Sequence, residues 1–214
     1  MKRTTKIFSM IALAIITLIS NSSCEQIKDE SKTKTCGIKA VTLKTDMRKL
    51  WEDHVIWTRN VILCIADELP GKSQAVKRLL QNQDDIGNIF KLYYGEGMGN
   101  NLTKLLYVHI NSFAEVAQAI KTNNTSVHDE ANKRLVANAD EISQFLCKAN
   151  PNWALTDMKM MMQEHLKITT DEAMQRINKN YDADVIAFDK TNKEILSMAD
   201  MFTEGIIKQF PEKF

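Results

Sequence analysis

From residue 45 to the C-terminus, apolar residues recur with the period of about 3.6 that marks one face of an α-helix. Only 7 glycines and 3 prolines occur among the 214 residues, and they lie almost entirely where the periodic stretches end. No stretch has the alternating pattern typical of a β-strand. The periodicity therefore predicts an all-α fold.

The breaks divide this region into long and short helices. Long helices are expected at about 45–68, 99–122, 126–148 and 181–209. Short helices are expected at 73–81 and 84–94, and again after Thr156 and from Thr169. The order long, short, short, long thus occurs twice, which indicates a pseudo-duplication with little residue identity. We therefore predict an antiparallel four-helix bundle with two pairs of short intervening helices, forming one domain over residues 45–214.

The first 23 residues have the features of a secretory signal peptide. A positively charged start is followed by the apolar run 7–19, which is too short to span a bilayer. Cys24 then stands where bacterial lipoproteins carry their lipidated cysteine, although Asn21 occupies the position at which leucine is usual. We expect lipidation of Cys24 and a membrane-anchored, extracytoplasmic protein. Cleavage without lipidation, giving a secreted or periplasmic protein, and an uncleaved anchor are the alternatives.

Residues 24–44 are charged and weakly apolar, so we predict a flexible tether there. Cleavage before Cys24 would remove three of the 28 basic residues and leave 25 against 27 acidic ones. A chain so close to neutrality has no basic surface of the kind that binds nucleic acid.

Three of the four histidines lie on the apolar stripes of different predicted helices. In a bundle, His54, His109 and His165 either converge on a transition metal such as iron, zinc or copper, or each is buried and hydrogen-bonded alone. The carboxylates expected beside such a metal site are Glu52, Asp140 and Glu164, with Glu141 and Asp184 as further candidates. A protein without any cofactor is the simpler expectation.

Motifs of known metalloenzymes and hydrolases do not occur in the chain. It contains neither the Glu-x-x-His of di-iron bundles nor the His-Glu-x-x-His of zinc peptidases. There is also no Gly-x-Ser-x-Gly, and no cysteine–histidine arrangement indicates a nucleophile. The sequence therefore predicts no catalytic residues.

The sulfur-containing residues allow two interpretations. Met158, Met161, Met162 and His165 share one helical face, and thioethers favour Cu(I). The same spacing is what a core-facing helix requires, so we favour packing over copper binding. Cys64 and Cys147 lie inside helical patterns and either form a disulfide or are buried as thiols.

Several longer motifs resemble a family of small bacterial all-helical proteins that are exported or lipid-anchored and have no established function. The likeness covers residues 45–214 and rests on these segments: LWEDHVIWTRN (50–60), LLQNQDDIGN (79–88), KLYYGEG (91–97), NADEISQFLCKANPNW (138–153), KMMMQEHLKITTDEA (159–173) and MADMFTEGIIKQFPEKF (198–214). Some relatives are labelled glycosyltransferase or acetylglutamate kinase, but this chain has no nucleotide-binding loop and no parallel-sheet pattern.

The resemblance implies export and a helical fold, and no catalytic role for any residue. It directs attention to residues in or near the motifs, which are Trp51, Glu52, His54, Arg59, His109, Asp140, Glu164 and His165. The sequence thus predicts a lipid-anchored helical protein that binds a protein or small-molecule partner, or serves as an accessory of the cell envelope. The alternative is a metal-binding bundle that uses inward-facing histidines.

Overall fold

The structure, a computed structural model, describes the backbone of residues 19–214 and the side chains from residue 37 onward. Most of the predicted signal peptide lies outside the described residues, and so does the side chain of Cys24. Within residues 19–214 there are helices and no strands, which confirms the predicted all-α class.

Six α-helices are followed by a short 3-10 helix. They are α1 (Ile19–Ala66), α2 (Lys72–Tyr94), α3 (Glu96–Lys121), α4 (Thr125–Ala149), α5 (Leu155–Ile177), α6 (Tyr181–Gln209) and η1 (Pro211–Lys213). The predicted long helices at 99–122, 126–148 and 181–209 match α3, α4 and α6 within a few residues. In α4, the Asn124 side chain caps the N-terminus by accepting a hydrogen bond from the Val127 amide at 3.2 Å.

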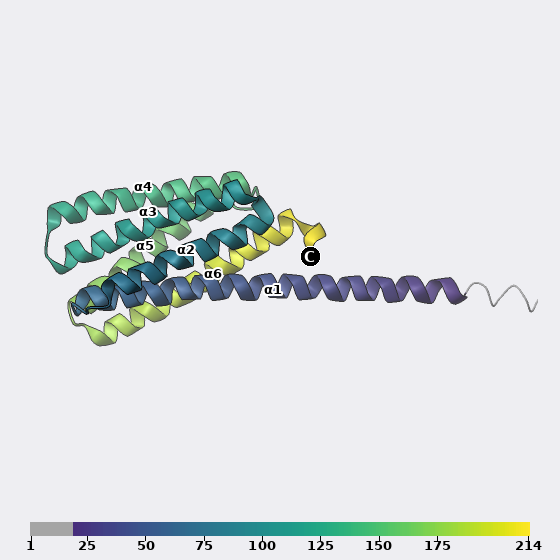
Figure 1. Ribbon diagram of the computed structural model, residues 1–214, viewed down its shortest axis with the longest axis horizontal. Helices are drawn as coiled ribbons and strands as arrows, with labels where there is room; N and C mark the ends of the chain where they lie inside the picture. Colours follow the sequence, from purple (N-terminus) through teal and green to yellow (C-terminus); the bar gives the residue numbers. More distant parts are fainter. Residues whose placement is uncertain (1–18) are drawn as a thin grey trace, which may run out of the picture.

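The helices form three consecutive hairpins, α1–α2, α3–α4 and α5–α6 (Figure 1). Each helix packs on its neighbours in the chain, and α6 packs on α1, so the bundle closes into a ring. The first helices of the three hairpins, α1, α3 and α5, also contact one another inside it. The helical bundle is as predicted, but it has six long helices in the part described, and three hairpins replace the expected two halves.

The predicted pairs of short helices are wrong, because each pair is one continuous helix, α2 or α5. The polar residues taken for helix breaks are buried and bonded within the bundle. In α2, the Asn82 side chain donates to the Leu50 carbonyl of α1 at 2.9 Å. In α5, the Thr169 hydroxyl donates to the His165 carbonyl one turn earlier at 2.7 Å. Such residues favour helix ends only when no partner inside the fold satisfies them.

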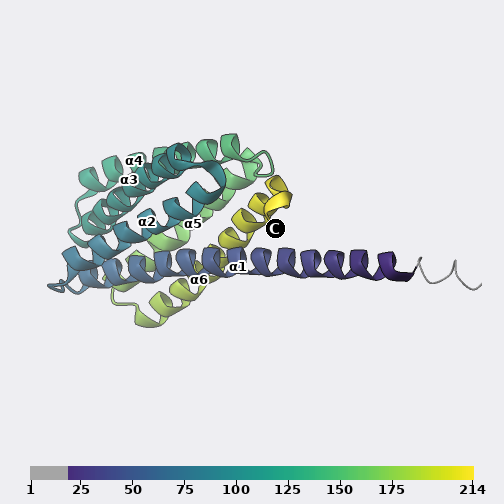
Figure 2. The ribbon, with the colours of Figure 1, turned by 45° about the vertical axis from the view of Figure 1, so that its right-hand side comes forward.

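The flexible tether expected at 24–44 is not observed. Helix α1 begins at Ile19 and runs through this segment without a break. The segment has no proline and is rich in lysine, which is a good helix former. Low apolarity therefore did not mean an irregular backbone. The part of α1 nearest the N-terminus projects beyond the other helices in both ribbon views (Figures 1 and 2), whereas Leu43 and Met47 are already buried in the core.

Aromatic side chains from three helices and one loop form the part of the core beside α6. Phe202 of α6 stacks on Trp51 of α1 with ring centroids 5.3 Å apart, and meets Phe90 and Trp153 edge-on. Such pairs add stability beyond the apolar area that they bury. No helix among the described residues combines the length and the apolar character that crossing a membrane requires.

Helices α2 and α3 approach closely at a glycine pair. A Cβ atom on Gly99 of α3 would lie 2.6 Å from the carbonyl oxygen of Gly87 of α2, a backbone atom that cannot move independently. The second helical glycine nearby, Gly97, has no atom within 4 Å of the equivalent position.

We therefore expect Gly99→Ala to lower the free energy of unfolding by about 1–3 kcal/mol, the usual cost of overpacking. Gly97→Ala is the matched control on the same helix, and should leave stability unchanged or raise it by up to about 1 kcal/mol. Urea denaturation followed by circular dichroism measures both. Equal stabilities of the two variants would contradict the close approach of α2 and α3.

Candidate functional site

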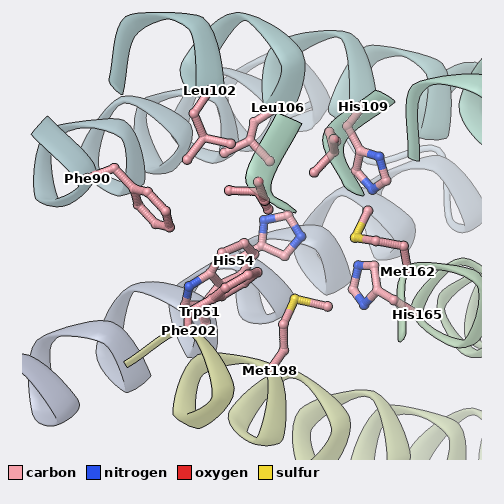
Figure 3. Close-up of a pocket in the computed structure, with 12 residues that line it drawn as sticks. Trp51, His54, Phe90, Leu102, Leu106, His109, Met162, His165, Met198 and Phe202 are labelled. Atoms are coloured by element: carbon pink, nitrogen blue, oxygen red, sulfur yellow. The ribbon is translucent and has the colours of Figure 1, made fainter. Parts of the chain in front are cut away.

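A small cavity lies at the centre of the bundle, between the three hairpins (Figure 3). Its volume is about 20 Å³. Apolar side chains form most of the wall, and the polar groups are three imidazoles and the indole of Trp51. The lining residues are Trp51, His54, Phe90, Leu102, Leu106, His109, Ile142, Leu146, Met162, His165, Met198 and Phe202.

The structure brings the three stripe histidines together at this cavity. His54 lies on α1, His109 on α3 and His165 on α5, so each hairpin contributes one imidazole from its first helix. The ring of His165 lies between the other two, with centroids 5.8 Å from His54 and 6.1 Å from His109. All three side chains are buried, since the residues are 3–5% exposed.

Each imidazole is held through Nδ1 by a polar side chain on the second helix of the same hairpin. Nδ1 of His54 is 3.3 Å from Gln83 Nε2, Nδ1 of His109 is 3.2 Å from Asn138 Oδ1, and Nδ1 of His165 is 3.0 Å from Glu194 Oε2. The two partners are 29 residues apart in every case. The site is therefore a motif repeated three times, once in each hairpin.

The hydrogen-bond partners assign the proton on each ring. The oxygens of Asn138 and Glu194 are acceptors, so His109 and His165 donate from Nδ1. In their neutral forms, these two rings have a lone pair on Nε2.

The third ring has the opposite arrangement. Gln83 Nε2 is also within hydrogen-bond distance of the Leu79 carbonyl and of Asn82 Oδ1, so it is surrounded by acceptors. It therefore donates to Nδ1 of His54, and the proton of a neutral His54 is on Nε2.

Burial keeps at least two of the rings neutral. Desolvation lowers the pKa of His54 well below its ordinary value, and the positive charge that His165 or His109 would carry lowers it further. The same two effects, burial and the proximity of His165, lower the pKa of His109 to about 3. The hydrogen bond that His109 donates to Asn138 raises its pKa, but this effect is weaker. At neutral pH these rings are uncharged.

Glu194 is the carboxylate at the site, and the sequence interpretation missed it. Its side chain is 16% exposed, and its only ion-pair partner among the described residues is His165. The second oxygen, Oε1, is buried without a hydrogen-bond partner. The signal that could have identified Glu194 is the 29-residue spacing, which becomes informative only after the three hairpins are known.

The carboxylates that the sequence interpretation placed near a metal do not line the cavity. Asp140 forms an ion pair with Lys159 at 3.3 Å, and Glu164 lies 3.9 Å from Lys167 on the surface. Glu52 is partly buried, and Glu141 is exposed. Each of these residues lies on a helix that contributes to the cavity, but none of them lines it.

Arg59 and Asp184 belong to a separate buried ion cluster with Glu172. The Arg59 guanidinium donates to Glu172 Oε1 at 2.9 Å and to Asp184 Oδ1 at 2.8 Å, and both carboxylates are 1% exposed. Burial raises the pKa of Glu172 to about 7, and the hydrogen bond and positive charge of Arg59 oppose this rise. The cluster joins α1, α5 and α6 and fixes how these helices pack.

The methionine-rich stretch contributes less to the site than its composition indicated. Met162 lines the cavity, but Met158 and Met161 do not, and the second lining methionine is Met198 of α6. The three methionines of this stretch therefore do not share the cavity with His165, and Met158 is fully buried in the core, in line with the favoured packing interpretation. Cys64 and Cys147 are free thiols, so the disulfide alternative is not observed.

Among the residues that the structure describes, no three His, Cys, Asp or Glu side chains are already positioned as metal ligands. Two imidazoles that share an ion through bonds of about 2.0–2.1 Å have ring centroids roughly 5–6.5 Å apart. The two observed ring distances, 5.8 and 6.1 Å, fall within this span, and both involve His165. A three-histidine site would require His54 and His109 to approach each other.

The lowered pKa values predict loss of stability in acid. Unfolding returns His109 from a pKa of about 3 to the ordinary 6.5, so the unfolded chain binds more protons between these pH values. The stabilising contribution is complete above pH 6.5 and falls below it, by up to about 1.4 kcal/mol per pH unit for one histidine.

We expect His109→Asn, which keeps a donor near Asn138, to reduce this acid dependence. Denaturant titrations at several pH values between 3 and 8 give the slope. A variant with the same slope as the wild type would show that His109 is not the buried neutral group described above.

Comparison with protein-family models finds no match for this chain. The comparisons with curated proteins and with solved structures also find no significant match. The resemblance noted from the motifs remains a prediction, and the function has to be argued from the geometry of the cavity.

Proposed function

We propose that this chain is a binding protein, not an enzyme, and that it holds a single transition-metal ion in the cavity at the centre of the bundle. The observation that carries the proposal is the meeting of three buried imidazoles, each from a different hairpin, at one cavity. One buried histidine would be an ordinary core residue that has found a partner. Three at the same point form a set of nitrogen donors suited to iron, copper or zinc.

The size of the cavity favours an ion over an organic ligand. Pockets for organic molecules have volumes of about 300–1,000 Å³, whereas this cavity has about 20 Å³. About 10–15 Å³ is enough for one water molecule. A water molecule or a metal ion fits, and a larger partner would have to displace the buried side chains.

The protonation of the rings also favours a metal. Metal-bound histidine commonly donates its other ring N–H to a carboxylate or carbonyl oxygen, which fixes the ring and increases its basicity. His165 has this arrangement with Glu194, and His109 has it with Asn138. Because burial keeps His109 neutral, no proton competes with the metal at its Nε2.

His54 would join these two after a rotation of the Gln83 amide. Gln83 Oε1 is buried without a hydrogen-bond partner. Rotation by about 180° would exchange the amide oxygen and nitrogen, so that Oε1 accepts a hydrogen bond from Nδ1–H of His54. Nε2 of His54 would then have its lone pair free. The hydrogen bonds from Gln83 to Leu79 and Asn82 are lost in the exchange, so metal binding has to offset that cost.

The test is metal binding by the full chain without an affinity tag. The chain is loaded with Co(II), Zn(II) or Cu(I) in turn, freed of unbound ions, and analysed by native mass spectrometry. We expect one ion per wild-type chain. Because His165 is the central ring, His165→Gln should weaken binding by more than the about 10- to 100-fold that loss of an outer partner costs.

His128→Gln is the matched control, because His128 is the histidine that lies outside the cavity. It should bind the ion as the wild type does. No binding by the wild type, or equal binding by the two variants, would refute the metal site and return the three histidines to a structural role.

We also propose that the protein is exported and held on a membrane surface by lipid on Cys24. The support is the signal-like start of the sequence and the position of Cys24 directly after it. The folded domain would then meet metal ions of the cell envelope.

Cys24→Ser should remove the lipid and move the protein from the membrane fraction to the soluble fraction of bacterial cells. Incorporation of radiolabelled palmitate into the wild type, but not the variant, would identify the anchor. Cys64→Ser, a change at an unpaired cysteine of the folded domain, is the control. Equal labelling of wild type and Cys24→Ser would rule out a lipid on Cys24.

A further inference from the structure

The donors around the cavity differ between the three hairpins. Two lining residues carry sulfur, Met162 of α5 and Met198 of α6, and both belong to the third hairpin. Met162 lies three residues before His165, where the other hairpins have Trp51 and Leu106. Met198 lies four residues after Glu194, where the other hairpins have Gly87 and Ile142. Soft donors are therefore concentrated at one side of the cavity.

The sulfur atoms lie among the imidazoles. In the close-up, the thioether of Met162 lies between the rings of His109 and His165, and that of Met198 lies beside His54 and His165 (Figure 3). Both residues are nearly fully buried, with 5% and 2% exposure. Two thioether sulfurs and the imidazoles of His109 and His165 thus lie together at this side of the cavity.

The third hairpin also carries the charge. Glu194 holds His165 through Oε2, has no Lys or Arg ion-pair partner among the described residues, and leaves Oε1 without a hydrogen bond. A buried charge is costly unless it is paired. A monovalent cation bound to the Nε2 of His165 would balance this single negative charge. A divalent cation would leave an excess positive charge within apolar walls.

We propose that the ion is monovalent copper, Cu(I), bound by His109, His165, Met162 and Met198. This inference rests on the proposed function and names the metal that the site selects. Thioether sulfur and imidazole nitrogen are both ligands of Cu(I), and thioethers bind hard divalent ions poorly. Cu(I) also accepts low and irregular coordination, so it does not require His54 and His109 to close around it. No oxidation or reduction of the bound ion is part of the proposal.

The experiment is a competition for Cu(I) between the full chain and a chromophoric Cu(I) chelator, without oxygen and with ascorbate. Co(II) and Zn(II) affinities are measured in parallel. We expect Cu(I) to bind at one equivalent and more tightly than either divalent ion. Ag(I), which has the same charge and is also soft, should compete for the site.

Substitutions separate ligands from packing. Met162→Leu and Met198→Leu keep the volume of the side chain and remove the sulfur, so the fold should persist. Each should lower the Cu(I) affinity by about 10- to 100-fold, as Glu194→Gln should for loss of the partner of His165. Met158→Leu is the matched control, because Met158 is fully buried one turn before Met162 and does not line the cavity. Thermal unfolding of each variant checks that the fold is kept.

The outcomes distinguish the two proposals. Cu(I) binding that is weakened at Met162 and Met198 but not at Met158 supports the assignment. Tighter binding of Co(II) or Zn(II), or Cu(I) binding that is insensitive to both methionines, overturns the assignment to Cu(I) and leaves a histidine metal site. Failure to bind any of the ions overturns both.

Discussion

The structure depends on three hydrogen bonds inside the bundle. Each joins a histidine on the first helix of a hairpin to a polar side chain on the second. A polar group inside an apolar core destabilises the fold unless it has a partner, so each bond fixes how its two helices face each other. His54, His109 and His165 are each held in this way. Because the first helices of the hairpins also contact one another, the three imidazoles held by these bonds meet at one cavity.

The position of the histidine and its hydrogen-bond partner is repeated in each hairpin, but the chemical type of the partner differs. The partners are an amide that donates at Gln83, an amide that accepts at Asn138, and a carboxylate at Glu194. Three similar positions therefore hold rings with different protonation and different charge nearby. The Arg59 cluster, away from the cavity, joins the first and third hairpins through buried ion pairs. As a result, the thioethers and the carboxylate of Glu194 all lie on the side of the cavity that the third hairpin forms.

Much of the fold could be predicted from periodicity, because a helix that buries one face must repeat its apolar residues with the helical period. The inward position of the histidines followed from the same stripes. The errors arose where a local signal had two meanings. Thr169 was interpreted as a helix start, since its side chain can bond to nearby backbone, and Asn82 fell in the gap between two expected short helices. In the bundle both side chains are satisfied mid-helix. Glu194 could not be identified, because its role is to hold His165, which lies 29 residues earlier in the chain on another helix.

The sequence by itself determined the all-α class, the ends of most long helices and the inward faces of His54, His109 and His165. These follow from local propensity and from the spacing of apolar residues, which act within one helix. Only the tertiary structure decided that the helices form three hairpins, that the imidazoles meet at one cavity of about 20 Å³, and that Met198 and Glu194 lie beside them. Contacts between helices depend on how whole faces pack, and no spacing along the chain specifies that packing.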